Sequence, residues 1–368
     1  MKAKHVIIYL LLVIVTSSCI RDEAPNAEAD ILSCRLPGIT MTTSPIINNN
    51  SVTLFVTPGT NISALAPEFT LTSGATITPA SGTERNFNSP QEYQVTAADG
   101  IWKKTYAISV IDTELATIYN FEDTISGKKY YIFVERENDK VIMEWASGNA
   151  GYAMTGVAKT ADDYPTFQIA NGKNGKCLSL VTRSTGFFGG LVGMPIAAGN
   201  LFIGSFDVNN AMSNPLQATK FGLPFRHVPT YLAGYYKYKA GDQFTEGGKP
   251  VEGKRDICDI YAIMYETSVS VPTLDGTNAF TSPNLVSMAR IKDAKETDEW
   301  TYFKLPFTTL PGKFIDKEKL TMGKYNISIV FTSSLEGDHF NGAIGSTLLI
   351  DCLLYTSPSP RDRSLPRM

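Results

Sequence analysis

The chain has 368 residues, a formal net charge of −3 and 19% charged residues, which excludes a wholly disordered or collagen-like protein and allows two domains. It contains only three histidines, and its five cysteines show no Cys-x-x-Cys spacing. A multi-histidine metalloenzyme, a zinc knuckle and a thioredoxin-type site are therefore excluded. The acidic balance also argues against electrostatic binding of nucleic acid.

The first residues predict an export signal. Residues 1–18 place Lys2 and Lys4 before an apolar run, Val6 to Val15, that is too short to span a bilayer. Small polar residues then lead to Cys19, in a pattern that resembles the bacterial lipobox. We therefore expect lipidation of Cys19; the alternative is ordinary cleavage beside an incidental cysteine.

Residues 19–30 are polar and predict a short linker. The triplet Arg21-Asp22-Glu23 resembles the signal that directs Bacteroidota lipoproteins to the outer face of the outer membrane. The expected location is thus the Gram-negative outer membrane, lipid-anchored and exposed at the cell surface. The alternative is a solvated charge cluster.

The last residues, 352–368, read CLLYTSPSPRDRSLPRM and are rich in Pro, Ser and Arg. They resemble translated sequencing-adapter read-through; the alternative is a native basic tail. On the first interpretation Cys352 is not native and the domain loses its final strand after Asp351, which predicts an open sheet edge and poor stability. Without the charged residues of leader and tail, the net charge becomes −7. The three remaining body cysteines, Cys34, Cys177 and Cys258, allow at most one disulfide.

Residues 31–112 show short alternating strand patterns between turn residues. EYQVTAADGIWKKTYAISV predicts a hairpin that turns at Asp99-Gly100, and Ser73-Gly74 separates two further strands. This pattern fits an immunoglobulin-like β-sandwich. Its expected core residues are Tyr93, Val95, Trp102, Tyr106, Ile108 and Val110. Trp102 has a second interpretation as a sugar platform.

Residues 113–351 are again mostly β, with strand patterns at NLFIGSFDV, YLAGYYKYKAG, CDIYAIMYE, WTYFKLPF and YNISIVFTSS. In CDIYAIMYE, Asp259 and Tyr261 take one face, whereas Ile260 and Ala262 take the other. An aromatic-bearing face opposite an aliphatic one predicts a jelly-roll sheet with a concave, partly aromatic outer surface, unless both faces are buried. Loops are expected at 155–176, 239–257, 272–284 and 335–347. The Gly-rich segment GFFGGLVG is expected to be a flexible aromatic loop.

Several segments resemble the putative carbohydrate metabolism domain (PCMD) family of Bacteroidota lipoproteins, over roughly residues 120–351. They include GYAMTGVAKTADDYPTF, AAGNLFIGSFDV, NPLQATKFGLPF, LAGYYKYKAGDQF and, most specifically, FTSSLEGDHFNGAIGSTLLID. The resemblance implies a jelly-roll domain related to carbohydrate-binding modules, with no established catalytic residues. Residues 31–112 resemble the small Ig-like modules that precede functional domains in such lipoproteins, which implies a spacer. The expected fold is thus all-β, an Ig-like sandwich followed by a larger jelly roll.

Sugar binding requires flat aromatic side chains flanked by hydrogen-bonding groups. The candidates are Trp145, Tyr231, Tyr236 and Tyr238. On a strand, Tyr236 and Tyr238 share a face while Tyr235 points the other way with Lys237, so at most one subset forms a platform. The alternatives are cross-strand packing for the tyrosines and a core position for Trp145.

Glycoside hydrolysis requires two carboxylates about 5–10 Å apart. The candidates are Glu144, Asp207, Asp259 and Glu266. Asp259 and Glu266 fall on opposite faces of one strand and cannot pair with each other. Glu144 with Asp207 or Asp259 remains open.

The sequence indicates no cofactor other than a candidate structural Ca²⁺. Jelly-roll modules often bind it with acidic residues at their first and last strands, here Glu122, Asp123 and Asp351. The alternative is solvated strand-end carboxylates.

The sequence therefore predicts a surface lipoprotein that binds oligo- or polysaccharide and assists outer-membrane glycan-uptake proteins. Two alternatives stay open: a glycoside hydrolase, and a non-catalytic adhesin or assembly protein.

Overall fold

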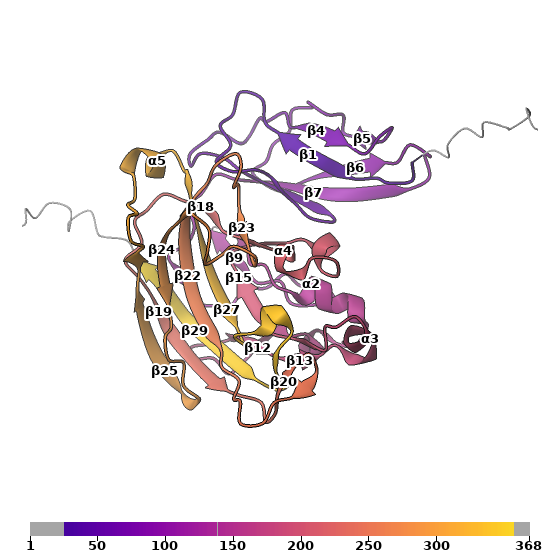
Figure 1. The fold of residues 1–368 in the computed structure, drawn as a ribbon. Coiled ribbons are helices and arrows are strands. Elements are labelled where there is room, and N and C mark those ends of the chain that lie inside the picture. The colour runs from indigo at the N-terminus through magenta and orange to yellow at the C-terminus, as the bar shows by residue number, and fades with distance from the viewer. Residues whose placement is uncertain (1–25, 138, 357–368) are drawn as a thin grey trace, which may run out of the picture.

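The computed structural model describes residues 26–137 and 139–356 and shows an all-β protein with a smaller and a larger part (Figure 1). The expected leader, the Cys19 anchor and the Arg21-Asp22-Glu23 triplet lie outside the described residues, as does the tail from residue 357. In the described part of the chain, no helix is long and apolar enough to cross a membrane.

The smaller part, at the top of Figure 1, is a β-sandwich. Five strands form one sheet in the order β2-β3-β7-β6-β5, in which β3 and β7 are parallel, and β1 pairs with β4. The strands are β1 (Ile31–Arg35), β2 (Ile46–Ile47), β3 (Ser51–Phe55), β4 (Glu68–Leu71), β5 (Thr76–Thr78), β6 (Gln91–Thr96) and β7 (Lys103–Ile111).

The hairpin expected in this sandwich is confirmed. Strands β6 and β7 pair from Thr96 and Lys103 outward, and Gly100 takes the positive φ of 71° that the turn requires. All the expected core residues are buried except Trp102, which is 63% exposed. Placing Trp102 in the core was wrong because this residue lies in the turn. The alternation that buries every second side chain starts only with β7, at Lys103.

The larger part is built around two six-stranded sheets. The first has the order β11-β12-β29-β19-β25, with β8 paired to β29; the second has the order β15-β27-β22-β24-β26, with β18 paired to β27. The first sheet comprises β8 (Ile118–Tyr119), β11 (Thr166–Ile169), β12 (Cys177–Val181), β19 (Tyr231–Lys239), β25 (Thr297–Pro306) and β29 (Thr347–Thr356). The second comprises β15 (Asn200–Phe202), β18 (Leu223–Phe225), β22 (Asp259–Glu266), β24 (Leu285–Arg290), β26 (Thr308–Thr309) and β27 (Tyr325–Thr332).

Shorter strands and helices lie between the strands of these sheets, and they fall in most of the segments expected to be loops. The short strands are β9 (Val134–Glu137), β10 (Lys140–Glu144), β13 (Arg183–Ser184), β14 (Ile196–Ala197), β16 (Gly204–Phe206), β17 (Thr219–Phe221), β20 (Phe244–Glu246), β21 (Lys249–Pro250), β23 (Leu274–Asp275) and β28 (Gly342–Ala343). The helices are α2 (Asn149–Tyr152), α3 (Gly186–Leu191), α4 (Pro215–Ala218) and α5 (Lys317–Thr321), with 3₁₀ turns η1 (Ala153–Thr155), η2 (Ala161–Asp163), η3 (Val208–Asn210) and η4 (Gly337–His339).

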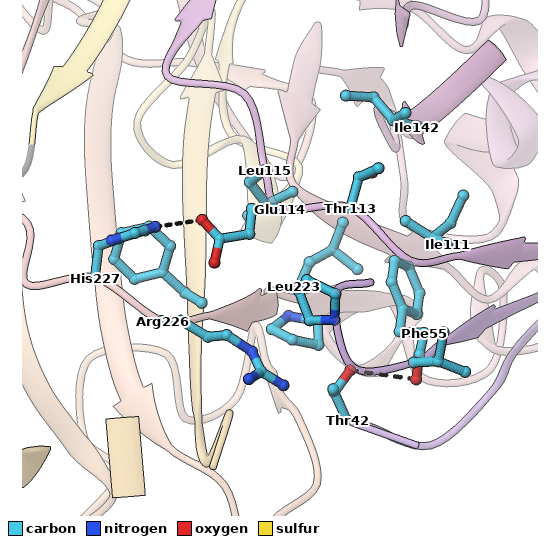
Figure 2. Close-up of a pocket in the computed structure, with 14 residues that line it drawn as sticks. Thr42, Phe55, Ile111, Thr113, Glu114, Leu115, Ile142, Leu223, Arg226 and His227 are labelled. Atoms are coloured by element: carbon cyan, nitrogen blue, oxygen red, sulfur yellow. Dashed lines mark hydrogen bonds and ion pairs between the residues drawn. The ribbon is translucent and has the colours of Figure 1, made fainter. Parts of the chain in front are cut away.

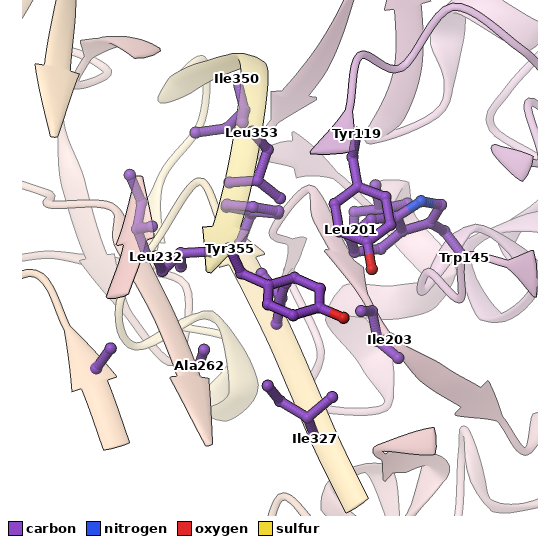
Figure 3. Close-up of a cluster of buried hydrophobic side chains, with 14 of the residues drawn as sticks. Tyr119, Trp145, Leu201, Ile203, Leu232, Ala262, Ile327, Ile350, Leu353 and Tyr355 are labelled. Carbon is purple, nitrogen blue, oxygen red and sulfur yellow. The ribbon is translucent and has the colours of Figure 1, made fainter. Parts of the chain in front are cut away.

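The main core lies between the two large sheets (Figure 3). Ala262 of β22, Leu232 of β19 and Ile350 of β29 are buried in one apolar cluster. On its other face, β22 places Tyr261 and Ile263 in a second cluster with residues of the inserted segments. The predicted alternation of β22 is confirmed, but both faces are largely covered.

The last strand extends beyond the predicted domain end at Asp351. Strand β29 continues to Thr356, and Leu353 and Tyr355 are buried in the core. Because β29 lies between β12 and β19, it occupies the interior of its sheet. In this sequence the final strand is therefore complete to Thr356, and its sheet is not left open at Asp351.

The two parts of the protein contact each other directly. Phe55 and Ile111 of the sandwich belong to the core cluster of the larger part. Figure 2 shows the small pocket at this contact, where His227 Nε2 lies 2.5 Å from Glu114 Oε2. The described cysteines are free thiols, so none of them forms a disulfide with another.

Candidate functional site

A pocket with a volume of about 260 Å³ lies on the aromatic face of the second large sheet. Its floor comes from neighbouring strands: Asp259 and Tyr261 of β22, Arg290 of β24, and Val330 and Thr332 of β27. Segments around α2, α3, α4 and η4 supply its walls. The pocket therefore lies on the face for which the sequence predicted a concave aromatic surface.

An ion pair between buried Asp259 and half-buried Arg290 forms the polar part of the floor. Arg290 ends β24 and Asp259 begins β22, and these antiparallel neighbours bring their ends together. The Arg290 Nη2 atom lies 2.6 Å from Asp259 Oδ2, and Nε donates to Oδ1 at 3.2 Å. Burial raises the pKa of Asp259, and the guanidinium opposes that rise. Asp259 is thus held by a two-point contact that fixes its orientation.

Aromatic rings flank the guanidinium. Arg290 lies 4.4 Å from the Phe280 ring centroid and 5.7 Å from that of Tyr261. The two rings pack against each other with centroids 4.9 Å apart. Because 42% of Phe280 is exposed, this ring remains available to a ligand. Aromatic surface beside fixed hydrogen-bonding groups is the combination that sugar recognition requires.

A second carboxylate, Asp338 of η4, also lines the pocket. Asp338 is exposed, and its charge contributes to raising the pKa of Asp259. Sequence reasoning missed Asp338, Arg290 and Phe280 as site residues. Asp338 lies within the family-like segment LEGDHFNG, and Phe280 lies in a segment expected to be a loop, so the family motif was the only available signal.

Part of the pocket lining is apolar. The segment expected to be a flexible aromatic loop forms helix α3 between Gly186 and Gly193, which have φ values of 71° and 77°. Phe188 and Val192 line the pocket, and Phe187 is 83% exposed at the surface. The pocket lining therefore combines apolar side chains with the ion pair.

The other candidate carboxylates lie elsewhere: Asp259 is the only one of the four that lines this pocket. Glu144 ends β10 and is exposed. Asp207 caps η3 and accepts a hydrogen bond from the Asn209 backbone N–H. Glu266 pairs with Lys319. The structure therefore does not bring Glu144 or Asp207 to Asp259 in this pocket.

The sugar-binding candidates separate by burial. Trp145 is only 3% exposed in the main core, where its indole N–H donates to Glu135 Oε1 at 2.9 Å. Tyr236 and Tyr238 are buried on the inner face of β19. These three rings lie in the main core and present no platform at the surface of this structure. Tyr231 is half-buried on the outer face of β19.

The carboxylates considered for Ca²⁺ bind backbone instead. Glu122 Oε1 accepts from the Lys176 N–H at 3.0 Å, and Asp351 Oδ2 accepts from the Asn174 N–H at 2.8 Å. Both thus hold the loop between β11 and β12, while Asp123 is exposed. Among the described residues, no group of three or more His, Cys, Asp or Glu side chains is arranged to hold a metal ion. This donor set does not fit a calcium site.

The most specific family-like motif has a structural explanation. The Oδ2 atom of buried Asp256 accepts from Ser334 Oγ and Ser346 Oγ, both at 2.6 Å, and from the Ala343 N–H at 2.8 Å. Thr182 Oγ1 lies 2.6 Å from Ser334 Oγ. This network ties the end of β27 to β28 and to the start of β29, behind the η4 wall of the pocket.

Comparisons with known proteins agree with this architecture. Residues 120–354 match the family described as "Putative carbohydrate metabolism domain", and residues 31–110 match "SGBP, N-terminal", the N-terminal module of surface glycan-binding proteins. A crystal structure described as a putative glycoside hydrolase from Bacteroides thetaiotaomicron is 84% identical, with a TM-score of 0.89, over 92% of this chain and 99% of that one. A second, from Bacteroides vulgatus, is 48% identical, with a TM-score of 0.63, over 67% and 99%. No curated protein is significantly similar to the chain.

Proposed function

Since the chain belongs to the putative carbohydrate metabolism domain family, we propose that it is a cell-surface lipoprotein that captures glycans without cleaving them. The pocket above β22 is the proposed site for a terminal sugar unit. Cys19 carries the lipid in this proposal, and the Ig-like sandwich holds the larger part away from the membrane. The match of residues 31–110 to surface glycan-binding proteins supports this arrangement.

One observation carries the proposal: a fixed Asp259–Arg290 pair stands beside the exposed ring of Phe280 in one pocket. The ring offers a flat face to the C–H groups of a pyranose. The guanidinium donors and the Asp338 carboxylate offer hydrogen bonds to hydroxyl groups. The ion pair fixes the polar groups before the ligand arrives, which lowers the ordering cost of binding.

The direct test is a glycan array probed with the purified full-length protein, followed by calorimetric titration of the best glycan. Phe280→Ala should weaken binding by about two- to tenfold, since it removes one stacking ring. The matched control is Phe314→Ala, which removes a ring that is 73% exposed and does not line the pocket. Failure of the array to retain any glycan, or equal affinity of wild type and Phe280→Ala, would contradict the proposal.

The anchor is tested separately. Cells grown with labelled palmitate should label the wild-type protein and not Cys19→Ala, and protease added to intact cells should digest the wild type. An unlabelled wild-type protein would refute the lipid anchor and leave the binding proposal standing. Co-purification of an outer-membrane glycan-uptake protein with the anchored form would test the proposed partnership.

A glycoside hydrolase is the second candidate, because two carboxylates, Asp259 and Asp338, share the pocket. Burial raises the pKa of Asp259 while its two-point contact with Arg290 opposes that rise, and Asp338 supplies the second carboxylate that glycoside hydrolysis requires. Release of reducing sugar from the best array glycan, abolished by Asp338→Asn with binding retained, would replace capture by hydrolysis.

A further inference from the structure

A second aromatic surface lies on the outer face of the first large sheet, at β19 and the edge strand β25 at the lower left of Figure 1. Leu232 and Tyr236 point into the core, so Tyr231 and Tyr235 point outward from β19. Phe303 likewise points inward from β25. We call this surface the ring–lysine face; its members are Tyr231, Tyr235, Trp300, Tyr302, Lys173, Lys237 and Lys304.

Three of the four rings are in contact with the ammonium group of a lysine. Lys304 Nζ lies 4.1 Å from the Tyr231 ring centroid, and Lys173 Nζ lies 5.1 Å from that of Tyr235. Lys237 Nζ lies 5.4 Å from the Trp300 ring. These distances fall in the range of cation–π contacts. The face thus repeats one unit, an aromatic ring with a lysine ammonium over it.

The fourth ring joins the units across the strands. Tyr302 is paired with Tyr235 in the sheet register, and their ring centroids are 5.4 Å apart. Tyr302 is 54% exposed. The tyrosine pair therefore continues the aromatic surface from β19 to the edge strand.

The charges of this face are available to a ligand. None of the salt bridges in the described part of the chain involves Lys173, Lys237 or Lys304. Carboxylates near this face are Asp298 and Glu299, which are exposed on the bulge that precedes Trp300, and Glu122 and Asp351, which accept hydrogen bonds from the backbone of the loop between β11 and β12. Three lysines that form no salt bridge among the described residues, placed on an aromatic surface, favour a ligand with negatively charged groups.

We propose that the ring–lysine face is a second glycan-binding surface, and that it takes an extended acidic polysaccharide bearing carboxylate or sulfate groups. On binding, the flexible lysine side chain moves its ammonium from the ring to the acidic group of the ligand, and the ring then accepts the C–H face of the sugar unit. Because the face is an open sheet surface with repeated units, it suits the middle of a chain, whereas the pocket suits an end. The inference does not depend on the pocket, which opens on the other large sheet.

The test is affinity electrophoresis of the full-length protein in gels that contain polygalacturonate, chondroitin sulfate or neutral dextran. We expect at least one of the acidic polymers to retard the protein and dextran to have no effect. Added salt should reduce the retardation, because it screens the charges. Retardation by polygalacturonate assigns a carboxylate ligand. Chondroitin sulfate bears both carboxylate and sulfate groups, so retardation by it alone assigns a ligand whose sulfate is required. Tyr302→Ala should weaken the interaction about two- to tenfold.

Matched variants separate this face from the rest of the surface. Lys304→Ala should also reduce retardation, whereas Lys317→Ala, which removes an exposed lysine on α5, and Phe314→Ala should not. Phe280→Ala should leave retardation unchanged, so a failed pocket and a failed face give different results. Absence of retardation by both acidic polymers, or equal retardation of Tyr302→Ala, Lys304→Ala and wild type, would overturn the inference.

Discussion

Removing the Asp256 carboxylate should destabilise the larger part of the protein. Asp256 is 4% exposed, and its two oxygens accept hydrogen bonds from Ser334, Ser346, Ala343 and the Ile257 N–H. Asp256→Ala leaves these donors without their acceptor inside the protein. Each hydrogen bond to a charged group contributes about 1.5–3 kcal/mol, but the carboxylate also bears a burial cost. Each buried donor left unpaired costs about 1–3 kcal/mol, and loss of the carboxylate's own burial cost offsets part of the total, so we expect a net loss of about 3 kcal/mol.

The assay is urea unfolding followed by tryptophan fluorescence, since Trp145 and Trp300 both lie in the larger part. Asp256→Asn should fall between wild type and Asp256→Ala, because the amide keeps one acceptor oxygen and turns a donor toward other donors. Asp242→Ala is the control, because it makes the same substitution at an exposed aspartate. A change for Asp256→Ala within about 0.5 kcal/mol, the range of ordinary surface substitutions, would refute the reasoning.

Three further predictions follow from burial and backbone geometry. Burial raises the pKa of Glu135 from 4.5 to about 7, so the folded protein keeps a proton that the unfolded chain loses. Stability should therefore fall as pH rises from about 4.5 to 7, and Glu135→Gln should flatten that slope in urea titrations. Gly342→Ala should lower Tm more than Gly345→Ala, since both have positive φ but only the Cβ at 342 would meet a serine hydroxyl, at 2.7 Å. Burial raises the pKa of Cys34 and Cys177 to about 12, so neither thiol should react with a thiol reagent at pH 8 before unfolding.

Each of these three has a contrary outcome. Parallel pH slopes for wild type and Glu135→Gln would show that this carboxyl is not protonated in the folded state. Equal melting temperatures for the two glycine variants would show that the segment beside Asp256 yields without cost. Rapid labelling of the native protein at Cys34 or Cys177 would show that the sheets open far more readily than their burial indicates.

The sequence by itself determined the elements and their faces. A strand repeats every two residues, so the alternation in β22 assigned Asp259 and Tyr261 to one face and Ile260 and Ala262 to the other without knowledge of the neighbours. The hairpin at Gly100 was equally local, because the turn depends only on its own residues.

Only the tertiary structure decided which faces are open and which side chains meet. Local alternation cannot show that Trp145 and Tyr236 face the opposite sheet, or that Tyr231 does not. It also cannot bring Arg290 to Asp259 across 31 residues of chain. Both the pocket and the ring–lysine face arise from strand order. Strand order depends on which strands, far apart in the chain, pair with each other, and a local sequence pattern does not specify this.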